Sequence, residues 1–160
     1  MRIVSLSENH NIEKRIAITP EIAKKYVSHG MEVSLPANYG AHLGFNDQEY
    51  LNVGVTIKND EKEIINSANI IIQLGLLSDD KNSLIRENQT LIGVLNPYAN
   101  ESKLKDLVKK NVNVFSLELL PRITRAQSMD ILSSQANLAG YKAVLESFAN
   151  FEKAIPMMMT

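Results

Sequence analysis

The side chains best suited to bind a ligand lie in one polar stretch that follows Pro121. Large apolar residues are few between Pro121 and Leu138, and most of the other side chains can form hydrogen bonds. The polar members of the stretch are Arg122, Thr124, Arg125, Gln127, Ser128, Asp130, Ser133, Ser134, Gln135 and Asn137. The stretch lacks the Gly, Pro, Glu and Lys bias of a disordered linker. A long polar segment inside a compact domain is usually a binding element.

Four of these side chains have a spacing that would bring them together. In a helix or tight turn, Gln127 and Asp130 lie on neighbouring turns of one face, as do Asp130 and Ser133. Arg122 precedes them on the segment leading in. A guanidinium, an amide, a carboxylate and a hydroxyl can then converge on one small polar ligand. Spacing alone leaves a second interpretation equally open, namely a polar helix N-terminus whose side chains are solvated.

The same stretch offers no obvious group for bond-breaking chemistry. No His, Cys or Lys lies between Pro121 and Tyr141. These are the side chains that most often serve as nucleophiles or as proton carriers near neutral pH. We therefore expect the stretch to hold a ligand, and we predict no catalytic residue in it.

Composition excludes several other classes of protein. The 160 residues have a formal net charge of -1, with 44% hydrophobic and 22% charged residues, so no basic excess indicates nucleic acid or a lipid surface. No Cys is present, which excludes disulfides and thiolate metal sites. His10, His29 and His42 lack metal-ligand spacing, so we predict no metal site. No apolar run approaches the roughly 20 residues of a membrane helix.

Short apolar runs alternate with amphipathic segments along most of the chain. Strands are expected at residues 2–6, 31–35, 55–57, 69–74, 90–95 and 112–117. Helices are expected between them, beginning near residues 20, 46, 60, 79 and 100. This alternation predicts an α/β fold, with an open and mostly parallel Rossmann-like sheet and helices on both faces. Ligands of such sheets bind at the carboxyl ends of the strands, and the polar stretch follows the last strand.

From about residue 133 the apolar pattern becomes that of one long helix, expected to continue to about Ala154. Its apolar positions are Leu138, Tyr141, Val144, Leu145, Phe148 and Phe151. Gly140 either weakens this helix by about 1 kcal/mol or marks a close packing contact. Pro156 is expected to end it, before a short Met-rich run. We divide the chain into an α/β domain, residues 1–132, and a helical segment, residues 133–160.

The run PRITRAQSMDILSSQANLAGYKAV resembles the signature loop of the proton-translocating nicotinamide nucleotide transhydrogenases. More narrowly, the whole chain is similar to the N-terminal part of the NAD(H)-binding component, domain I, of the alpha subunit. The resemblance implies hydride transfer between NAD(H) and NADP(H), coupled to proton translocation. It also implies that Arg122, Gln127, Asp130 and Ser133 reach the nicotinamide end of NAD(H).

Further expectations follow from the same resemblance. Residues 133–160 would link the first domain to a second domain that carries a Gly-rich dinucleotide fingerprint, which this chain lacks. The chain would then be an N-terminal fragment, inactive by itself. NADP(H) would bind to a partner subunit or domain. The component would form a homodimer, docked through its partners at the cytoplasmic face of the bacterial inner membrane.

Two other functions are weighed against this one. The related alanine dehydrogenases bind the substrate carboxylate through an Arg that matches Arg15, although a shared structural role explains Arg15 more simply. Those enzymes also use a Lys and a His where this chain has Gly75 and Asn96. Without them a keto-acid reductase could neither polarise a carbonyl nor deliver a proton. The third possibility is a non-catalytic module that only assembles with partners.

Overall fold

The computed structural model describes residues 1–154. The chain divides into two compact units, Met1–Leu119 and Leu120–Thr160. The first unit contains the sheet and most of the helices, and the second contains the polar stretch and the long helix. The predicted Met-rich run and the end at Pro156 lie outside the described residues.

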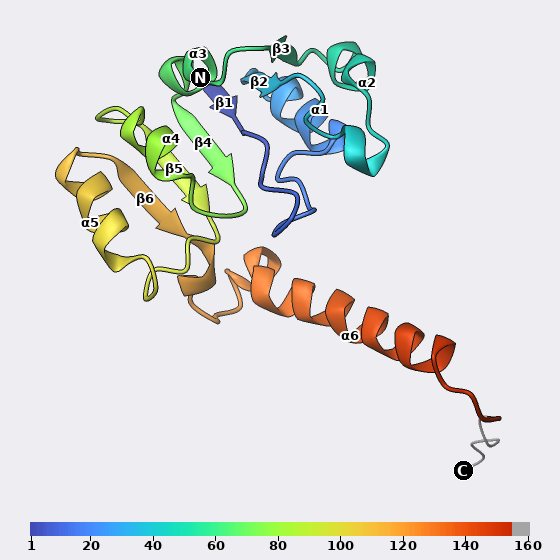
Figure 1. Cartoon of the computed structure of the whole chain (residues 1–160). Helices are drawn as coiled ribbons and strands as arrows, with labels where there is room; N and C mark the ends of the chain where they lie inside the picture. Colours follow the sequence, from blue (N-terminus) through green and yellow to red (C-terminus); the bar gives the residue numbers. More distant parts are fainter. Residues whose placement is uncertain (155–160) are drawn as a thin grey trace. The chain divides into compact units, whose positions relative to one another are not determined.

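The first unit is built on one parallel sheet of six strands in the order β3-β2-β1-β4-β5-β6 (Figure 1). The strands are β1 (Arg2–Val4), β2 (Glu32–Pro36), β3 (Thr56–Lys58), β4 (Ile70–Gln73), β5 (Thr90–Gly93) and β6 (Asn113–Ser116). Every neighbouring pair is parallel. The order changes direction between β1 and β4, which is the topological switch point of a doubly wound sheet. The predicted α/β fold and all six predicted strands are confirmed.

Helices cover both faces of this sheet because successive strand residues point to opposite sides. In β1, Ile3 packs in a cluster with Ala23 of α1 and Tyr50 of α2. The adjacent Val4 packs in a separate cluster with residues of α3 and α5. The helices of this unit are α1 (Pro20–Ser28), α2 (Asp47–Asn52), α3 (Glu61–Ser67), α4 (Asp79–Ser83) and α5 (Glu101–Lys109), with 3-10 turns η1 (Ala41–Leu43) and η2 (Leu117–Leu119). Both apolar faces of the sheet are therefore buried.

Local sequence sets where several of these helices begin. Thr19 accepts the backbone N–H of Ile22 ahead of Pro20, the first residue of α1. Asn46 and Glu49 form a reciprocal capping box at α2, with N–O distances of 3.1 and 3.0 Å. These helix starts agree with the sequence prediction.

Helix α4 is shorter than predicted, since it ends at Ser83 and not near Glu87. The cause is a buried amide that competes for the following backbone. Gln89 accepts the N–H of Arg86 at 2.7 Å, and its Nε2 atom donates to the carbonyls of Ile65 and Ala68 at 2.7 and 2.8 Å. The segment after α4 is thereby tied to the end of α3 and does not continue as a helix.

The second unit contains the predicted long helix, α6 (Ile131–Ala149), preceded by the 3-10 turn η3 (Gln127–Met129) (Figure 1). It ends five residues before the predicted Ala154. Asn150 ends it by donating both its backbone N–H and its side-chain amide to the carbonyl of Glu146, at 3.1 and 2.8 Å. No residue of α6 is buried. No helix within residues 1–154 is long and apolar enough to span a membrane.

Two glycines allow a test of packing at the sheet centre. A Cβ atom on Gly93 in β5 would lie 2.3 Å from the carbonyl oxygen of Gln73 in β4, whereas a Cβ on Gly140 would meet no described atom within 4 Å. We expect Gly93→Ala to lower the free energy of unfolding by about 3 kcal/mol, because the two backbones would have to move apart. Gly140→Ala should be neutral or stabilise α6 by up to about 1 kcal/mol. Urea denaturation measures both, and a cost under about 0.5 kcal/mol for Gly93→Ala would contradict the expected clash.

Candidate functional site

The predicted polar stretch forms an irregular loop that leads through η3 into α6. Asp130 is the N-cap of this helix, and its carboxylate accepts the backbone N–H of Ser133 at 3.0 Å and the Ser133 hydroxyl at 2.6 Å. The backbone N–H of Asp130 donates to the carbonyl of Gln127 at 3.3 Å. The two three-residue spacings in the sequence thus become a turn and a helix cap, consistent with the solvated helix N-terminus as well as with a ligand site.

Two neighbouring hollows in this unit bring the four predicted residues together. One has a volume of about 330 Å³ and is lined by Arg122, Gln127 and Asp130, among others. The other has a volume of about 360 Å³ and is lined by Gln127, Asp130 and Ser133. Because Gln127 and Asp130 line both hollows, all four side chains border one continuous polar region.

The four side chains differ in how they are held. The hydroxyl and backbone N–H of Ser133, together with the nearby Arg122 guanidinium, hold the pKa of Asp130 below its usual range. Asp130 is therefore a carboxylate at neutral pH, bonded to Ser133. Arg122 and Gln127 are exposed, and within residues 1–154 no hydrogen bond engages either side chain. The loop thus has one braced pair and two side chains available for contact with a ligand.

A second candidate site, which sequence reasoning missed, lies in the first unit beyond the carboxyl ends of β1 and β4. A crevice of about 480 Å³ opens there, lined by Ser7, Glu8, Asn9, Gln73, Leu74 and Gly75 among others. This is the switch point of the sheet, where doubly wound folds bind ligands. The sequence showed only a polar loop at residues 7–14, and the strand order that brings this loop beside β4 was not predictable from it.

The crevice is floored by a buried amide. Gln73 is 2% exposed, and it pairs with Leu6 in both directions. Its Nε2 atom donates to the Leu6 carbonyl at 2.9 Å, and its Oε1 atom accepts the Leu6 N–H at 3.1 Å. These bonds continue the contact between β1 and β4 past the last paired residues of the strands.

Glu8 crosses the crevice to the end of β4. One oxygen of its carboxylate, Oε1, accepts the backbone N–H groups of Leu74 and Gly75 at 2.8 and 3.2 Å. Burial raises the pKa of Glu8 above its ordinary value, and the nearby charge of Glu13 adds to this, although the two N–H donors oppose it. Gly75, where alanine dehydrogenases have a Lys, therefore contributes only its backbone N–H to the crevice.

Glu118 plays a similar part at the end of β5. It accepts the N–H groups of Leu95 and Asn96 at 3.3 and 2.5 Å and the hydroxyl of Ser116 at 2.7 Å. Burial favours the neutral acid, but these hydrogen bonds outweigh it, so the pKa of Glu118 is lowered. Asn96, where alanine dehydrogenases have a His, has a left-handed backbone with φ 46° and is held through its N–H. Neither position carries an acid or base side chain.

The structure joins two histidines that lie 32 residues apart in the sequence. The rings of His10 and His42 stack with centroids 3.8 Å apart, and His42 Nε2 contacts the Lys14 carbonyl oxygen at 2.7 Å. His29 is the C-cap of α1, as its place at the predicted helix end suggested. Within residues 1–154 no group of three or more His, Asp or Glu side chains is placed to hold a metal ion.

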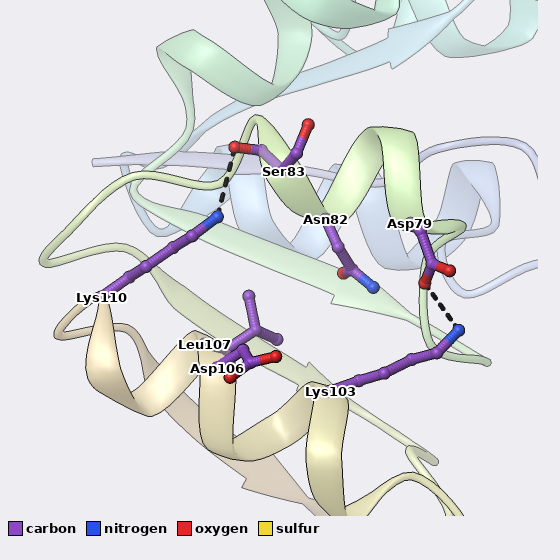
Figure 2. Close-up of a pocket in the computed structure, with 7 residues that line it drawn as sticks. All are labelled: Asp79, Asn82, Ser83, Lys103, Asp106, Leu107 and Lys110. Atoms are coloured by element: carbon purple, nitrogen blue, oxygen red, sulfur yellow. Dashed lines mark hydrogen bonds and ion pairs between the residues drawn. The ribbon is translucent and has the colours of Figure 1, made fainter.

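A third hollow, of about 560 Å³, lies between α4 and α5 (Figure 2). Its charges are already paired with one another. Lys103 bonds Asp79 at 2.6 Å, and Lys110 reaches the Ser83 carbonyl at 3.4 Å. The Asn82 Oδ1 atom is without a hydrogen-bond partner among the described residues, but it is buried away from solvent. This hollow therefore has no uncommitted group that would select a ligand.

Comparison with known proteins places the chain in a family. Residues 5–139 match the family model described as alanine dehydrogenase/PNT, N-terminal domain. Over its whole length the chain is 43% identical to the first of the separately encoded parts of NAD(P) transhydrogenase subunit alpha in Rickettsia prowazekii, and 37% identical to the protein of the same name from Rhodospirillum rubrum. The chain spans 43% of the length of each of these relatives. The alanine dehydrogenase of Halomonas elongata is 27% identical over 96% of the chain, which spans 41% of that protein.

Solved structures agree with these similarities. The transhydrogenase of Sinorhizobium meliloti superposes with a TM-score of 0.86 at 36% identity, covering 98% of this chain and 47% of that one. An L-alanine dehydrogenase superposes with a TM-score of 0.69 at 22% identity, covering 74% of this chain and 32% of that one, which supports the shared fold alone. The similarity to transhydrogenase alpha subunits that the sequence indicated is confirmed. The chain belongs to the alanine dehydrogenase/PNT N-terminal domain family.

Proposed function

We propose that this chain is the N-terminal part of the NAD(H)-binding component of a proton-translocating NAD(P)+ transhydrogenase alpha subunit. The observation that carries the proposal is the similarity along the entire chain to proteins named transhydrogenase alpha subunits, at 43% and 37% identity. The complete enzyme would transfer a hydride between NAD(H) and NADP(H), with NADP(H) bound by a partner subunit or domain. Within that assembly the component would be a homodimer at the cytoplasmic face of the bacterial membrane.

The loop before α6 would contact the nicotinamide end of NAD(H). Arg122 and Gln127 are exposed and uncommitted, so their guanidinium and amide groups would hold the carboxamide or nearby oxygens. Asp130 and Ser133 are already bonded to each other and would brace the loop or orient the ring. NAD(H), when bound, supplies the hydride chemistry. The four residues need only position the ring and keep water away from it, which suits a loop without a nucleophile or base.

The exposed surface of α6 supports a division into an α/β domain, residues 1–132, and a linking helix, residues 133–160. Tyr141 and Leu138 are 68% and 59% exposed, and Phe148 is 49% exposed. A helix with apolar side chains on all sides is normally covered by protein. We infer that α6 leads to, and packs against, the dinucleotide-binding domain that makes up much of the remaining length of such subunits. The adenosine and pyrophosphate of NAD(H) would bind to that domain.

An alanine dehydrogenase activity is disfavoured by the way the ends of β4 and β5 are occupied. Positions 75 and 96 present backbone N–H groups bound to Glu8 and Glu118, and neither carries a cation or an acid. The full-length protein should therefore fail to reduce pyruvate with NADH. Pyruvate reduction above the uncatalysed rate would favour the dehydrogenase instead. A purely assembling module is the remaining alternative, and it would show neither reaction.

Substitution in the loop tests the proposed roles. In the full-length enzyme, Gln127→Asn and Asp130→Asn should each slow hydride transfer by about 10- to 100-fold, because small misplacements of a reacting ring have effects of that size. The affinity for NADH should change by less than about threefold, since most contacts with the cofactor lie elsewhere. Stopped-flow hydride transfer and NADH titration measure the two quantities. Parental rates in both variants would refute the role assignment.

Arg125 offers a matched control, because it lies in the same loop but lines neither hollow. Arg125→Ala should transfer hydride at close to the parental rate. Asp130→Asn also alters the cap of α6, so protection of the Ser133 amide from hydrogen exchange should be compared in the same variant. A slow rate together with an intact helix start separates ligand positioning from capping.

The division of the cofactor site predicts weak binding by the 160-residue chain alone. We expect NADH fluorescence to show no saturation up to about 1 mM, because the chain lacks a Gly-rich phosphate loop. Micromolar binding to these 160 residues would show that they hold the whole cofactor, contrary to the proposal.

A further inference from the structure

We propose that the backbone N–H groups of Leu74 and Gly75 form a binding site for small carboxylates, and that Glu8 occupies this site from within the chain. The site is separate from the loop before α6 and does not depend on the proposed transhydrogenase function. Displacing Glu8 would open it to a carboxylate ligand from solution.

The first ground is geometric. Two consecutive N–H groups at the end of β4 point at the same oxygen, Glu8 Oε1, at 2.8 and 3.2 Å. Consecutive backbone donors of this kind form an anion-binding concavity. Both residues are partly buried, so without Glu8 their N–H groups would need another acceptor. A carboxylate is the acceptor that the protein itself supplies at this place.

The second ground is the space around Glu8. The carboxylate lies in the crevice of about 480 Å³ at the sheet's switch point, and not in a sealed interior. A Cβ atom on Gly75 would lie 3.6 Å from Glu8 Oε2, an ordinary contact distance. The absence of a side chain at position 75 therefore leaves room beside the outer oxygen. A small external carboxylate such as formate fits this room once the Glu8 side chain is withdrawn.

Glu118 shows what a purely structural carboxylate looks like in the same fold. It also accepts two consecutive N–H groups, but the Ser116 hydroxyl holds it in addition. Its pKa is lowered, whereas burial raises the pKa of Glu8. The ionised form of Glu8 is thus the less favoured of the two in its setting. Glu8 is the carboxylate that can be exchanged at lower cost.

Formate binding to Glu8→Ala tests the proposal. In ¹H–¹⁵N spectra of the whole chain at pH 7, formate should shift the Leu74 and Gly75 amides of Glu8→Ala saturably, with a Kd in the tens of millimolar, roughly the strength of two charge-assisted hydrogen bonds at a partly exposed site. The Leu95 and Asn96 amides should not move, because Glu118 still occupies them. Sodium chloride at equal ionic strength serves as the salt control.

Glu8→Gln is the matched control. Its amide oxygen can still accept both N–H groups, although the negative charge is gone. We expect its affinity for formate to be at least about tenfold weaker than that of Glu8→Ala. Equal responses of the two variants would show that only the charge mattered and would overturn the idea of an internal occupant. A lack of saturable shifts in folded Glu8→Ala, with water alone satisfying the two N–H groups, would overturn it as well.

A measurement on the parental chain covers the case in which Glu8→Ala does not fold. The raised pKa means that Glu8 becomes neutral at a higher pH than an ordinary Glu, and a neutral carboxyl competes less well for the N–H pair. The charged groups around it are Glu13 and Arg15 on its own loop and Lys81 from α4, with the Tyr39 hydroxyl near as well. Formate should shift the Leu74 and Gly75 amides several-fold more at pH 5 than at pH 7. Responses independent of pH would contradict the proposal.

Discussion

The pairing of β1 with β4 is the contact on which the rest of the first unit depends. Ile3 and Val4 pair with Ile70 and Ile71 at the centre of the sheet, and Gln73 extends this pairing to Leu6 through its side chain. The chain passes from β1 outward to β2 and β3, then returns to the other side of β1 at β4. The crevice exists at this place because the connections leave the two strands in opposite directions.

Carboxylates complete the ends of the two strands that follow. Glu8 binds the N–H groups after β4, and Glu118 binds those after β5. Both come from segments distant in sequence and satisfy backbone donors that the sheet leaves unpaired. The related dehydrogenases place their Lys and His at the same two strand ends. In this chain the ends are held by acidic side chains acting on the backbone, which leaves no cation there to polarise a carbonyl.

The loop before α6 shows how one set of residues can serve both structure and binding. Asp130 caps the helix through Ser133, which accounts for two of the four polar side chains without any ligand. Arg122 and Gln127 have no such structural role in the described residues. A ligand role is therefore best supported for these two, while the Asp130–Ser133 pair keeps the helix start in place.

The sequence by itself determined the strands, the helix starts and the family. Strands such as 69–74 and 90–95 are short apolar runs between turn residues, and caps such as Thr19 and Asn46 act within one turn, so both are local signals. The polar stretch 121–134 was recognisable for the same reason. Only the tertiary structure decided what depends on residues far apart in the chain. The Glu8 contact with Leu74 and Gly75, the stacking of His10 on His42 and the early end of α4 at Gln89 all require the strand order and the approach of distant segments, which hydrophobic periodicity does not encode.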